Sequence, residues 1–352
     1  MGKLAVYKYV SAMFLTIQII LVLFTFMGLF GGNVTPVGNM ARAMCVYILP
    51  LLIIANFLML IYWLVRRRWL FSLIPIVTIA CCIPYSGTIY QLSFDKPQEN
   101  TEKGLKIASY NVAMFGRETS GFMAQDILAE MRRQKVDVLC MQEYNETSGD
   151  RKNSVSYKEY FPYMQIGRDD MVIYSRYPIR NHKTILFDDT NNSAMWADIE
   201  INGEEIRVFN VHLQTTGINR TMRQAAKMQM NGGYEVSNSR LLNAIYGNYT
   251  IGMLFRAGQA VTVANEKRSS EKPCILCGDF NDVPYSFVYK TMLGNMVDGF
   301  KECGSGFMST FRGKKPVRID YIFHDEALKG LTYYRGDITY SDHYPVFMKI
   351  AL

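Results

Sequence analysis

Acidic residues are missing from the first part of this chain. No Asp or Glu occurs up to Gln91, although six Lys or Arg residues do. The whole protein holds 38 basic and 31 acidic residues, so 32 basic and 31 acidic residues remain after Gln91. Most of the net charge of +7 therefore belongs to the N-terminal part. A strongly basic C-terminal domain is excluded, although a local basic groove for nucleic acid is not.

Charge is also absent from three apolar runs in this N-terminal part, each near the ~20 residues that cross a bilayer core. The runs cover residues 9–30, 44–64 and 69–90. They predict a membrane domain over residues 1–91 with about three transmembrane helices. Pro75 and Pro84 weaken the third run. A buried helical bundle is the alternative, whereas a cleaved signal peptide fits poorly because its apolar run is usually only ~7–15 residues.

The distribution of Lys and Arg predicts the orientation of these helices. Lys3 and Lys8 precede the first run, and Arg66, Arg67 and Arg68 fill the loop before the third. Basic clusters stay in the cytoplasm. We therefore expect an integral protein of a bacterial inner or plasma membrane, whose C-terminal domain is extracytoplasmic, or periplasmic in a Gram-negative source.

Two kinds of site are not indicated by the sequence. Cys274-x-x-Cys277 resembles half of a zinc site, but no second pair accompanies it. No glycine-rich loop of the kind that cradles phosphates occurs either. We expect the cysteines to be buried free thiols, with one disulfide as the alternative in an oxidising compartment. Of four histidines, His212 and His343 lie in motifs, while His182 and His324 are expected at the surface.

The rest of the chain predicts a polar linker at 92–103 and one large domain at 104–352. Asn202-Gly203 joins two strand-like segments and indicates a type I′ hairpin. Residues 215–271 are weakly helical. The fold class is α/β (α+β), with two packed, mostly antiparallel sheets flanked by helices. Further strands are expected at 105–110, 136–141, 171–175, 274–277, 317–323 and 346–350, and a helix at 123–134.

Polar strings stand at the ends of several of these strands, where open sheets build active sites. They combine carboxylates with amides and histidines. Mg²⁺ prefers oxygen ligands, and phosphate-ester hydrolysis needs neutralised oxygens, an oriented water and help for the leaving group. The strings therefore favour a hydrolase centre. They are Ser109-Tyr110-Asn111, Gln142-Glu143, Asn210-Val211-His212-Leu213, Gly278-Asp279-Phe280-Asn281, Arg318-Ile319-Asp320-Tyr321 and Ser341-Asp342-His343.

In this order the strings resemble those of the endonuclease/exonuclease/phosphatase superfamily. Its members include pancreatic-type deoxyribonucleases, abasic-site endonucleases, neutral sphingomyelinases and inositol polyphosphate 5-phosphatases. The resemblance covers residues 106–352. Gly278-Asp279-Phe280-Asn281 and the Ser-Asp-His-x-Pro-Val string at 341–346 are its most specific motifs. It implies a four-layer sandwich and a metal-dependent phosphoesterase.

The resemblance also implies roles for the motif residues. Asp279 would orient or deprotonate the attacking water, and Asn281 would hold a phosphate oxygen. The two motif histidines, His212 and His343, would donate hydrogen bonds to the phosphate, and Asp320 would pair with His343. Mg²⁺, or Mn²⁺, would be held by Glu143, Asn111 and Asp342. An Asp or Asn that only closes a turn is the alternative for such positions.

Weaker candidates for binding the substrate are Arg176, Tyr177, Arg220 and Arg312. A structural Tyr before Pro178 and solvated loop charges are the alternatives for them.

The sequence thus predicts a membrane-anchored hydrolase of phosphodiester or phosphomonoester bonds, most simply endonuclease-like. A phospholipid or sphingomyelin phosphodiesterase, or a phosphoinositide-type phosphatase, is the alternative that the anchor favours. However, Cys277 before Gly278 and Asp282-Val283 after Asn281 depart from the extended string of the 5-phosphatases. A receptor or scaffold that kept the fold would lack a motif residue, and none is missing. The expected partners are the bilayer and a nucleic acid or lipid head group; no protein partner is inferred.

Overall fold

A computed structural model describes residues 3–92, 104–113, 123–144, 157–168, 170–188, 190–216, 238–313 and 316–352. Residues 93–103 of the predicted linker lie outside these ranges. The chain divides into two compact units. The first comprises Met1–Thr88 with Val283–Lys290, and the second comprises Ile89–Asp282 with Thr291–Leu352.

The first unit is built from α1 (Lys3–Gly31), α2 (Met40–Val65), α3 (Trp69–Cys81) and α4 (Ile83–Ser86). Two stretches, Val6–Gly31 and Met40–Val65, are long and apolar enough to cross a membrane. The prediction of a third continuous span was wrong, because α3 has only 13 residues. Pro84 lies in the first turn of α4, where its missing N–H fits a helix start and not a helix interior.

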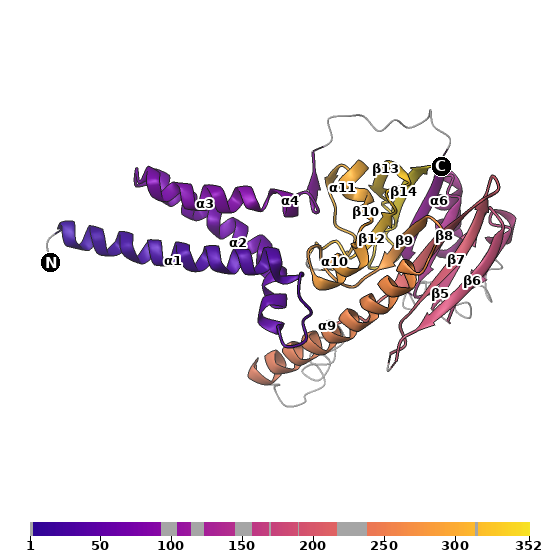
Figure 1. The fold of residues 1–352 in the computed structure, drawn as a ribbon, viewed down its shortest axis with the longest axis horizontal. Helices are drawn as coiled ribbons and strands as arrows, with labels where there is room; N and C mark the ends of the chain where they lie inside the picture. Colours follow the sequence, from indigo (N-terminus) through magenta and orange to yellow (C-terminus); the bar gives the residue numbers. More distant parts are fainter. Residues whose placement is uncertain are drawn as a thin grey trace. The chain divides into compact units, whose positions relative to one another are not determined.

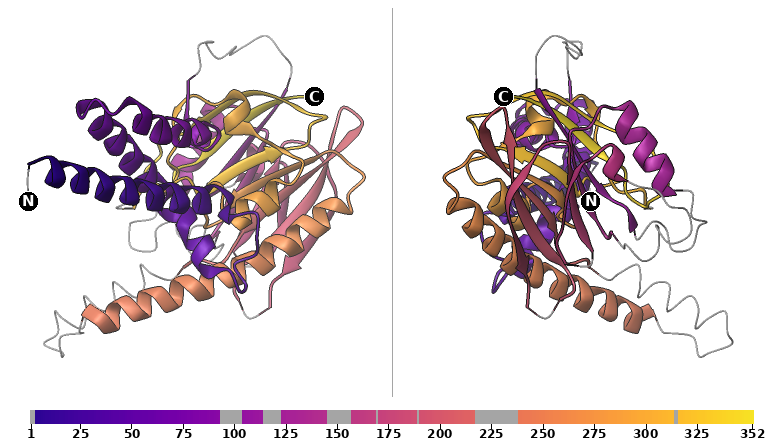
Figure 2. Two further views of the ribbon diagram at one scale, coloured as in Figure 1. Left: turned by 60° about the vertical axis from the view of Figure 1, so that its left-hand side comes forward. Right: turned by 90° about the vertical axis from the view of Figure 1, so that its right-hand side faces the viewer.

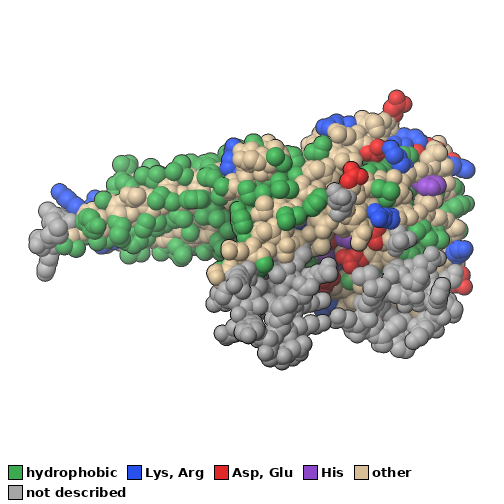
Figure 3. All heavy atoms as spheres, turned by 90° about the horizontal axis from the view of Figure 1, so that it is seen from below, with side chains coloured by type: hydrophobic (Ala, Val, Ile, Leu, Met, Phe, Trp, Pro, Cys, Tyr) green, Lys and Arg blue, Asp and Glu red, His purple; other side chains and the backbone are tan. Residues whose placement is uncertain are grey.

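Polar side chains in α1 and α2 face each other, while apolar ones face outward. Asn56 accepts a hydrogen bond from Gln18 Nε2 at 2.9 Å and donates one to Thr25 Oγ1 at 2.9 Å. Hydrophobic side chains cover the surface of these helices (Figure 3). Buried polar pairs under an apolar surface are typical of helices that pack within a bilayer.

The second unit contains two six-stranded, mostly antiparallel sheets. The first sheet has the order β13-β14-β2-β3-β5-β4 and the second has the order β10-β12-β9-β8-β7-β6. Among the neighbouring strands of these two sheets in the described residues, only β2–β3 and β8–β9 are parallel. The first sheet consists of β2 (Gly104–Asn111), β3 (Val138–Gln142), β4 (Tyr163–Ile166), β5 (Met171–Ser175), β13 (Lys329–Arg335) and β14 (Val346–Ala351). The second consists of β6 (Ile179–Leu186), β7 (Ser193–Ile201), β8 (Glu204–His212), β9 (Cys274–Asp279), β10 (Val297–Asp298) and β12 (Asp320–His324).

Alternate side chains of the two sheets meet in a shared core, which contains Ile107, Val138, Val208 and Ile275. Burial of each such side chain stabilises the fold by ~1.5–3 kcal/mol. The opposite face of the first sheet packs against α6 (Met123–Arg133). Figures 1 and 2 show the two sheets face to face with helices outside, so the predicted four-layer sandwich is confirmed.

The outer face of the second sheet is covered by α9 (Asn238–Arg268), in the segment predicted to be helical (Figure 1). Trp196 of β7 donates from Nε1 to Glu266 of this helix at 3.0 Å. Asn202 and Gly203 between β7 and β8 both have positive φ, 56° and 89°, as a type I′ turn requires. Smaller elements are β1 (Tyr90–Gln91) paired with β11 (Gly306–Phe307), η1 (Tyr157–Glu159), α10 (Phe287–Leu293) and α11 (Gly299–Cys303).

Candidate active site

The strand register of the second sheet places three motif residues in one row. His212 ends β8 opposite Asp279, which ends β9, and Asp320 begins β12 opposite the same Asp279. Neighbouring strands lie ~4.8 Å apart. The histidine and the two carboxylates are therefore brought together by backbone pairing alone.

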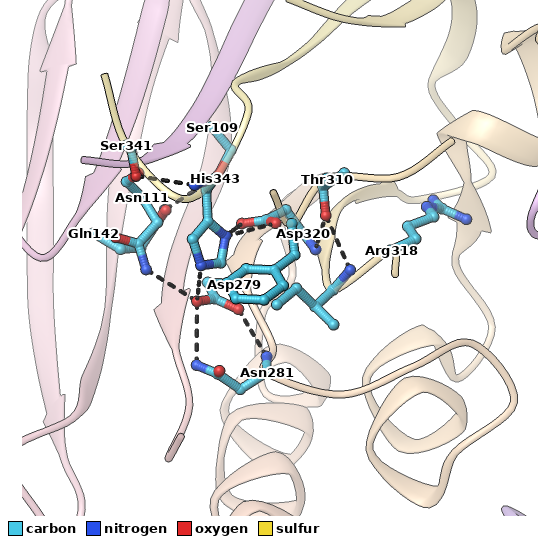
Figure 4. Close-up of polar contacts among 12 residues, drawn as sticks. Ser109, Asn111, Gln142, Asp279, Asn281, Thr310, Arg318, Asp320, Ser341 and His343 are labelled. Atoms are coloured by element: carbon cyan, nitrogen blue, oxygen red, sulfur yellow. Dashed lines mark hydrogen bonds and ion pairs between the residues drawn. The ribbon is translucent and has the colours of Figure 1, made fainter. Parts of the chain in front are cut away.

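The first sheet contributes Asn111 and Glu143 at its facing edge. Asn111 ends β2 and is paired in register with Gln142, the last residue of β3. Glu143 follows with a φ of 51°, an unusual conformation for a residue that is not glycine. Asn111 Nδ2 donates to Glu143 Oε1 at 3.1 Å and to Asp279 Oδ2 at 3.0 Å. This amide thus connects the carboxylates of the two sheets. Figure 4 shows its hydrogen bond to Asp279.

The glycine before Asp279 is required by a close backbone approach. Gly278 has a φ of 139°, and a Cβ atom there would lie 1.9 Å from the carbonyl oxygen of Val211. Asn281, with a φ of 51°, turns back towards Asp279. Its backbone N–H donates to Asp279 Oδ1 at 2.8 Å, and its Nδ2 donates to Oδ2 at 3.1 Å. The Asp279 carboxylate is therefore oriented by amides on both sides.

Burial and neighbouring charges shift the proton affinity of this carboxylate. Burial, together with the nearby negative charge of Asp320, raises the pKa of Asp279 to about 6, although the positive charge of His343 opposes the rise. A buried carboxyl group with such a pKa can accept a proton near neutral pH.

His343 lies between Asp320 and Asp279. Its Nδ1 is 2.9 Å from Asp320 Oδ2, and its Nε2 is 3.6 Å from Asp279 Oδ2. Burial lowers the pKa of His343, but the charges of Asp320 and Asp279 outweigh burial and raise it to about 10. The imidazole is therefore held as a cation.

The loop that carries His343 is fixed to the first sheet. Ser341 Oγ donates to the backbone oxygen of Asn111 at 2.7 Å and accepts from His343 N–H at 3.1 Å. Thr310 Oγ1 accepts from the backbone N–H of Asp320 at 3.1 Å, which fixes the other partner of His343. Figure 4 shows these hydroxyl groups on either side of the imidazole.

His212 is held by a residue that the sequence did not identify. Its Nδ1 is 3.2 Å from Asp170 Oδ2, and its Nε2 is 3.7 Å from Glu143 Oε1. Burial lowers the pKa of His212, but the hydrogen bond to Asp170 and the charges of Asp279 and Glu143 raise it on balance. Asp170 precedes β5 in a polar turn and belongs to none of the motif strings, so this pairing was not predicted.

A buried polar bridge joins the sheets beneath these groups. Gln142 Nε2 donates to Asn210 Oδ1 at 2.6 Å. Asn210 Nδ2 donates to the backbone oxygens of Met141 and Val172 at 2.9 and 3.0 Å. Buried networks of this kind fix one relative placement of the elements that they join.

Comparison with known families identifies the fold. The model of the Endonuclease/Exonuclease/phosphatase family matches residues 108–343. The chain belongs to this family. The matched residues include all six polar strings of the sequence. A second model, described as a domain of unknown function (DUF8431), matches residues 11–89. No curated protein sequence matches the chain.

Several solved structures are similar to this chain. An endonuclease/exonuclease/phosphatase from Beutenbergia cavernae is 16% identical with a TM-score of 0.50, covering 71% of this chain and 72% of its own. A Bacteroides thetaiotaomicron mannosyl-6-phosphatase is 18% identical, covering 70% and 100%, with a TM-score of 0.47. A Streptomyces griseocarneus sphingomyelinase C is 16% identical, covering 71% and 100%, with a TM-score of 0.46. At these identities a structural likeness bears on the fold alone and not on the substrate.

Two groups of this family member could hold a metal ion. Asp279, Asp320 and His343 offer one ligand atom each, and these atoms lie within 4.8 Å of one another. Glu143, with about a third of its side chain exposed, and Asn111 form the oxygen group predicted from the sequence. Asp342 is exposed, and its backbone oxygen accepts from Arg312 N–H at 2.7 Å.

The structure places Arg176 and Tyr177 away from the site. Arg176 and Tyr177 follow Ser175, which pairs with Val138, whereas Met171 at the other end of β5 pairs with Gln142. Arg176 instead forms an ion pair with Asp137 at 2.8 Å. The prediction failed because β5 runs antiparallel to β3.

Of the two remaining basic candidates, the structure describes only Arg312. Arg312 donates to the backbone oxygens of Thr339 and Ser341, so it supports the loop before His343. Arg220 lies outside the described residues. His182 is exposed as expected, but His324 is buried, with Nε2 2.7 Å from Glu302.

Proposed function

We propose that this protein is a membrane-anchored phosphoesterase that requires a divalent metal and hydrolyses phosphodiester or phosphomonoester bonds by in-line attack of water. One observation carries the proposal. A cationic His343, the buried carboxylate of Asp279 and the Asn111–Glu143 pair form one connected polar group drawn from both sheets. Family membership supports the same chemistry.

The chain's own groups divide the work of the reaction. Asp279 orients the attacking water and accepts its proton, because its carboxylate is buried and directed by Asn111 and Asn281. His343 donates from Nε2 to a phosphate oxygen and stabilises the charge that develops there, while Asp320 keeps Nδ1 occupied. His212 contributes a second donor, and Asn281 holds a phosphate oxygen.

The donor chemistry of the site fits a hard cation. Glu143, Asn111 and Asp342 would hold Mg²⁺ or Mn²⁺ through oxygen atoms. The carboxylates of Asp279 and Asp320 are less suited, because the amides and His343 already contact both oxygens of each. The contacts named above engage only Oε1 of Glu143. When bound, the cation neutralises the non-bridging oxygens of the phosphate.

Removal of metal should abolish turnover. We expect the full-length protein in detergent to hydrolyse bis(p-nitrophenyl) phosphate with Mg²⁺, to lose this activity in EDTA and to regain it with Mg²⁺ or Mn²⁺. Glu143→Gln should raise the Mg²⁺ concentration for half-maximal rate ~10–100-fold. Glu200→Gln is the matched control, because Glu200 is also a partly exposed carboxylate, paired with Arg180, and its loss should not change this concentration. Full activity in EDTA would contradict metal dependence.

The proposed activity is endonuclease-like: the substrate is a nucleic acid, which is cleaved at its phosphodiester bonds. A lipid head group is the second candidate, and the two apolar helices favour it. Rates on DNA, RNA, sphingomyelin and phosphoinositides under one metal condition separate the two. A lipid substrate that outpaces both nucleic acids would replace the first candidate with the second.

The first unit is proposed to anchor the protein in the bilayer, with the second unit outside the cytoplasm. The basic residues at the N-terminus and at 66–68 support this orientation. We expect protease added to intact spheroplasts to cleave the second unit, as detected by an antibody against the C-terminus. A cytoplasmic protein of the same cells serves as the control for lysis. Protection until the membrane is permeabilised would reverse the orientation.

A further inference from the structure

A buried arginine of α9 reaches the backbone segments that follow two of the catalytic strands. Arg256 has no exposed surface. Its Nη1 donates to the backbone oxygen of Gln214 at 3.0 Å, and its Nε lies 3.3 Å from Asp282 Oδ2. Gln214 comes two residues after His212, and Asp282 comes directly after Asn281. One side chain thus binds both the segment that follows β8 and the segment that follows β9.

A second side chain of the same helix completes the hold on Gln214. Gln259 lies three residues after Arg256, on the same helix face. Its Oε1 accepts from the backbone N–H of Gln214 at 2.8 Å, and its Nε2 donates to Thr190 Oγ1 at 3.3 Å. Both the N–H and the carbonyl of Gln214 are therefore bound to α9.

A glycine allows the helix to come this close. A Cβ atom at Gly252, one turn before Arg256, would lie 3.2 Å from Arg256 Nη1 and 3.2 Å from the backbone oxygen of Thr215. Such distances are shorter than an ordinary van der Waals contact, so a larger residue would push α9 away from this segment.

The segments that follow β8 and β9 are also hydrogen-bonded to each other. Leu213 N–H donates to the backbone oxygen of Asp279 at 3.0 Å, and Asn281 Nδ2 donates to the backbone oxygen of Leu213 at 2.9 Å. A buried guanidinium destabilises a protein unless its N–H groups bind acceptors. Its planar fork can bind two acceptors in fixed directions, which the single ammonium of lysine cannot.

We propose that Arg256 and Gln259 are positioning residues for the hydrolysis: they fix the segment after His212 against the segment that carries Asp279 and Asn281. They touch no reacting atom. They act through the backbone, so their loss misplaces His212 and Asn281 relative to Asp279. This inference rests on the proposed function of the same site.

The test compares Arg256→Lys with Arg207→Lys in the full-length protein. Arg207 donates from Nε and Nη2 to both oxygens of buried Asp198, at 2.7 and 3.0 Å, in the same sheet but five residues before His212. We expect Arg256→Lys to lower kcat ~10–100-fold with a much smaller change in KM. Arg207→Lys should lower the melting temperature but leave kcat unchanged. Gly252→Ala should lower kcat in the same direction, by less.

Amide hydrogen exchange gives a readout besides activity. Arg256→Lys should speed exchange at 212–216 and 279–283, and Arg207→Lys should not. Wild-type kcat in Arg256→Lys would overturn the inference, as would equal kcat losses in both lysine variants. If Arg256→Lys does not fold, Gly252→Ala decides by the same two measurements. Should Asp279→Asn retain full activity, the proposed function itself fails; loss in Asp279→Asn with normal Arg256→Lys overturns only the positioning role.

Discussion

Asp279→Asn should reduce the rate of phosphodiester hydrolysis by ~10³–10⁴-fold, the upper range for loss of a general base. The change keeps the size of the side chain but removes the group that accepts the proton of water. In the wild type, Asn111 Nδ2 and both nitrogens of Asn281 donate to the carboxylate oxygens of Asp279. In the variant, the new amide NH₂ therefore faces donors. Initial rates on bis(p-nitrophenyl) phosphate at saturating Mg²⁺ measure the effect.

Asp137→Asn is the matched control for this variant. Asp137 is also a buried carboxylate, and it accepts from Lys106 N–H at 3.0 Å and from Arg176 at 2.8 Å. It lies at the opposite end of the first sheet from Asn111, so its loss should lower stability and not turnover. Equal rates for Asp279→Asn and the wild type would contradict the role of Asp279.

His343→Gln should lower kcat ~10²–10³-fold, as expected for loss of one donor to a developing charge. Glutamine retains a donor but not the positive charge, which Asp320 and Asp279 maintain on the imidazole. Asp320→Asn should produce part of the same loss, because it removes the partner of Nδ1. Single-turnover rates separate this effect from binding.

His324→Gln controls for the loss of a buried histidine. His324 lies in β12, the strand that carries Asp320. It has no exposed surface and pairs with Glu302 of α11. Its replacement should destabilise the protein without slowing turnover. If both histidine variants slow turnover equally, general destabilisation and not loss of the phosphate donor explains the result.

The fold and the motif group could be predicted because both depend on local pattern. Asn111, Asp279 and Asp320 each stand at a strand end, where alternating apolar residues give way to polar ones. Adjacent parallel or antiparallel strands then bring such ends together at one edge. The Asn202-Gly203 turn is equally local.

Features that depend on strand direction or on distant packing could not be predicted. Arg176 follows β5 as Asn111 follows β2, but β5 runs the other way and carries it to the far edge. Asp170 is recognised only when β5 packs beside β8. Arg256 lies in a helix whose sequence shows no clear amphipathic pattern, so its contacts with Gln214 and Asp282 gave no signal.

The row formed by His212, Asp279 and Asp320 makes chemistry and specificity separable during evolution. The spacing of these side chains is set by hydrogen bonding between strands β8, β9 and β12. Segments that leave those strands can lengthen, shorten or change composition while the reacting groups keep their positions. Substrate preference can therefore change with these segments while the positions of the reacting groups stay the same.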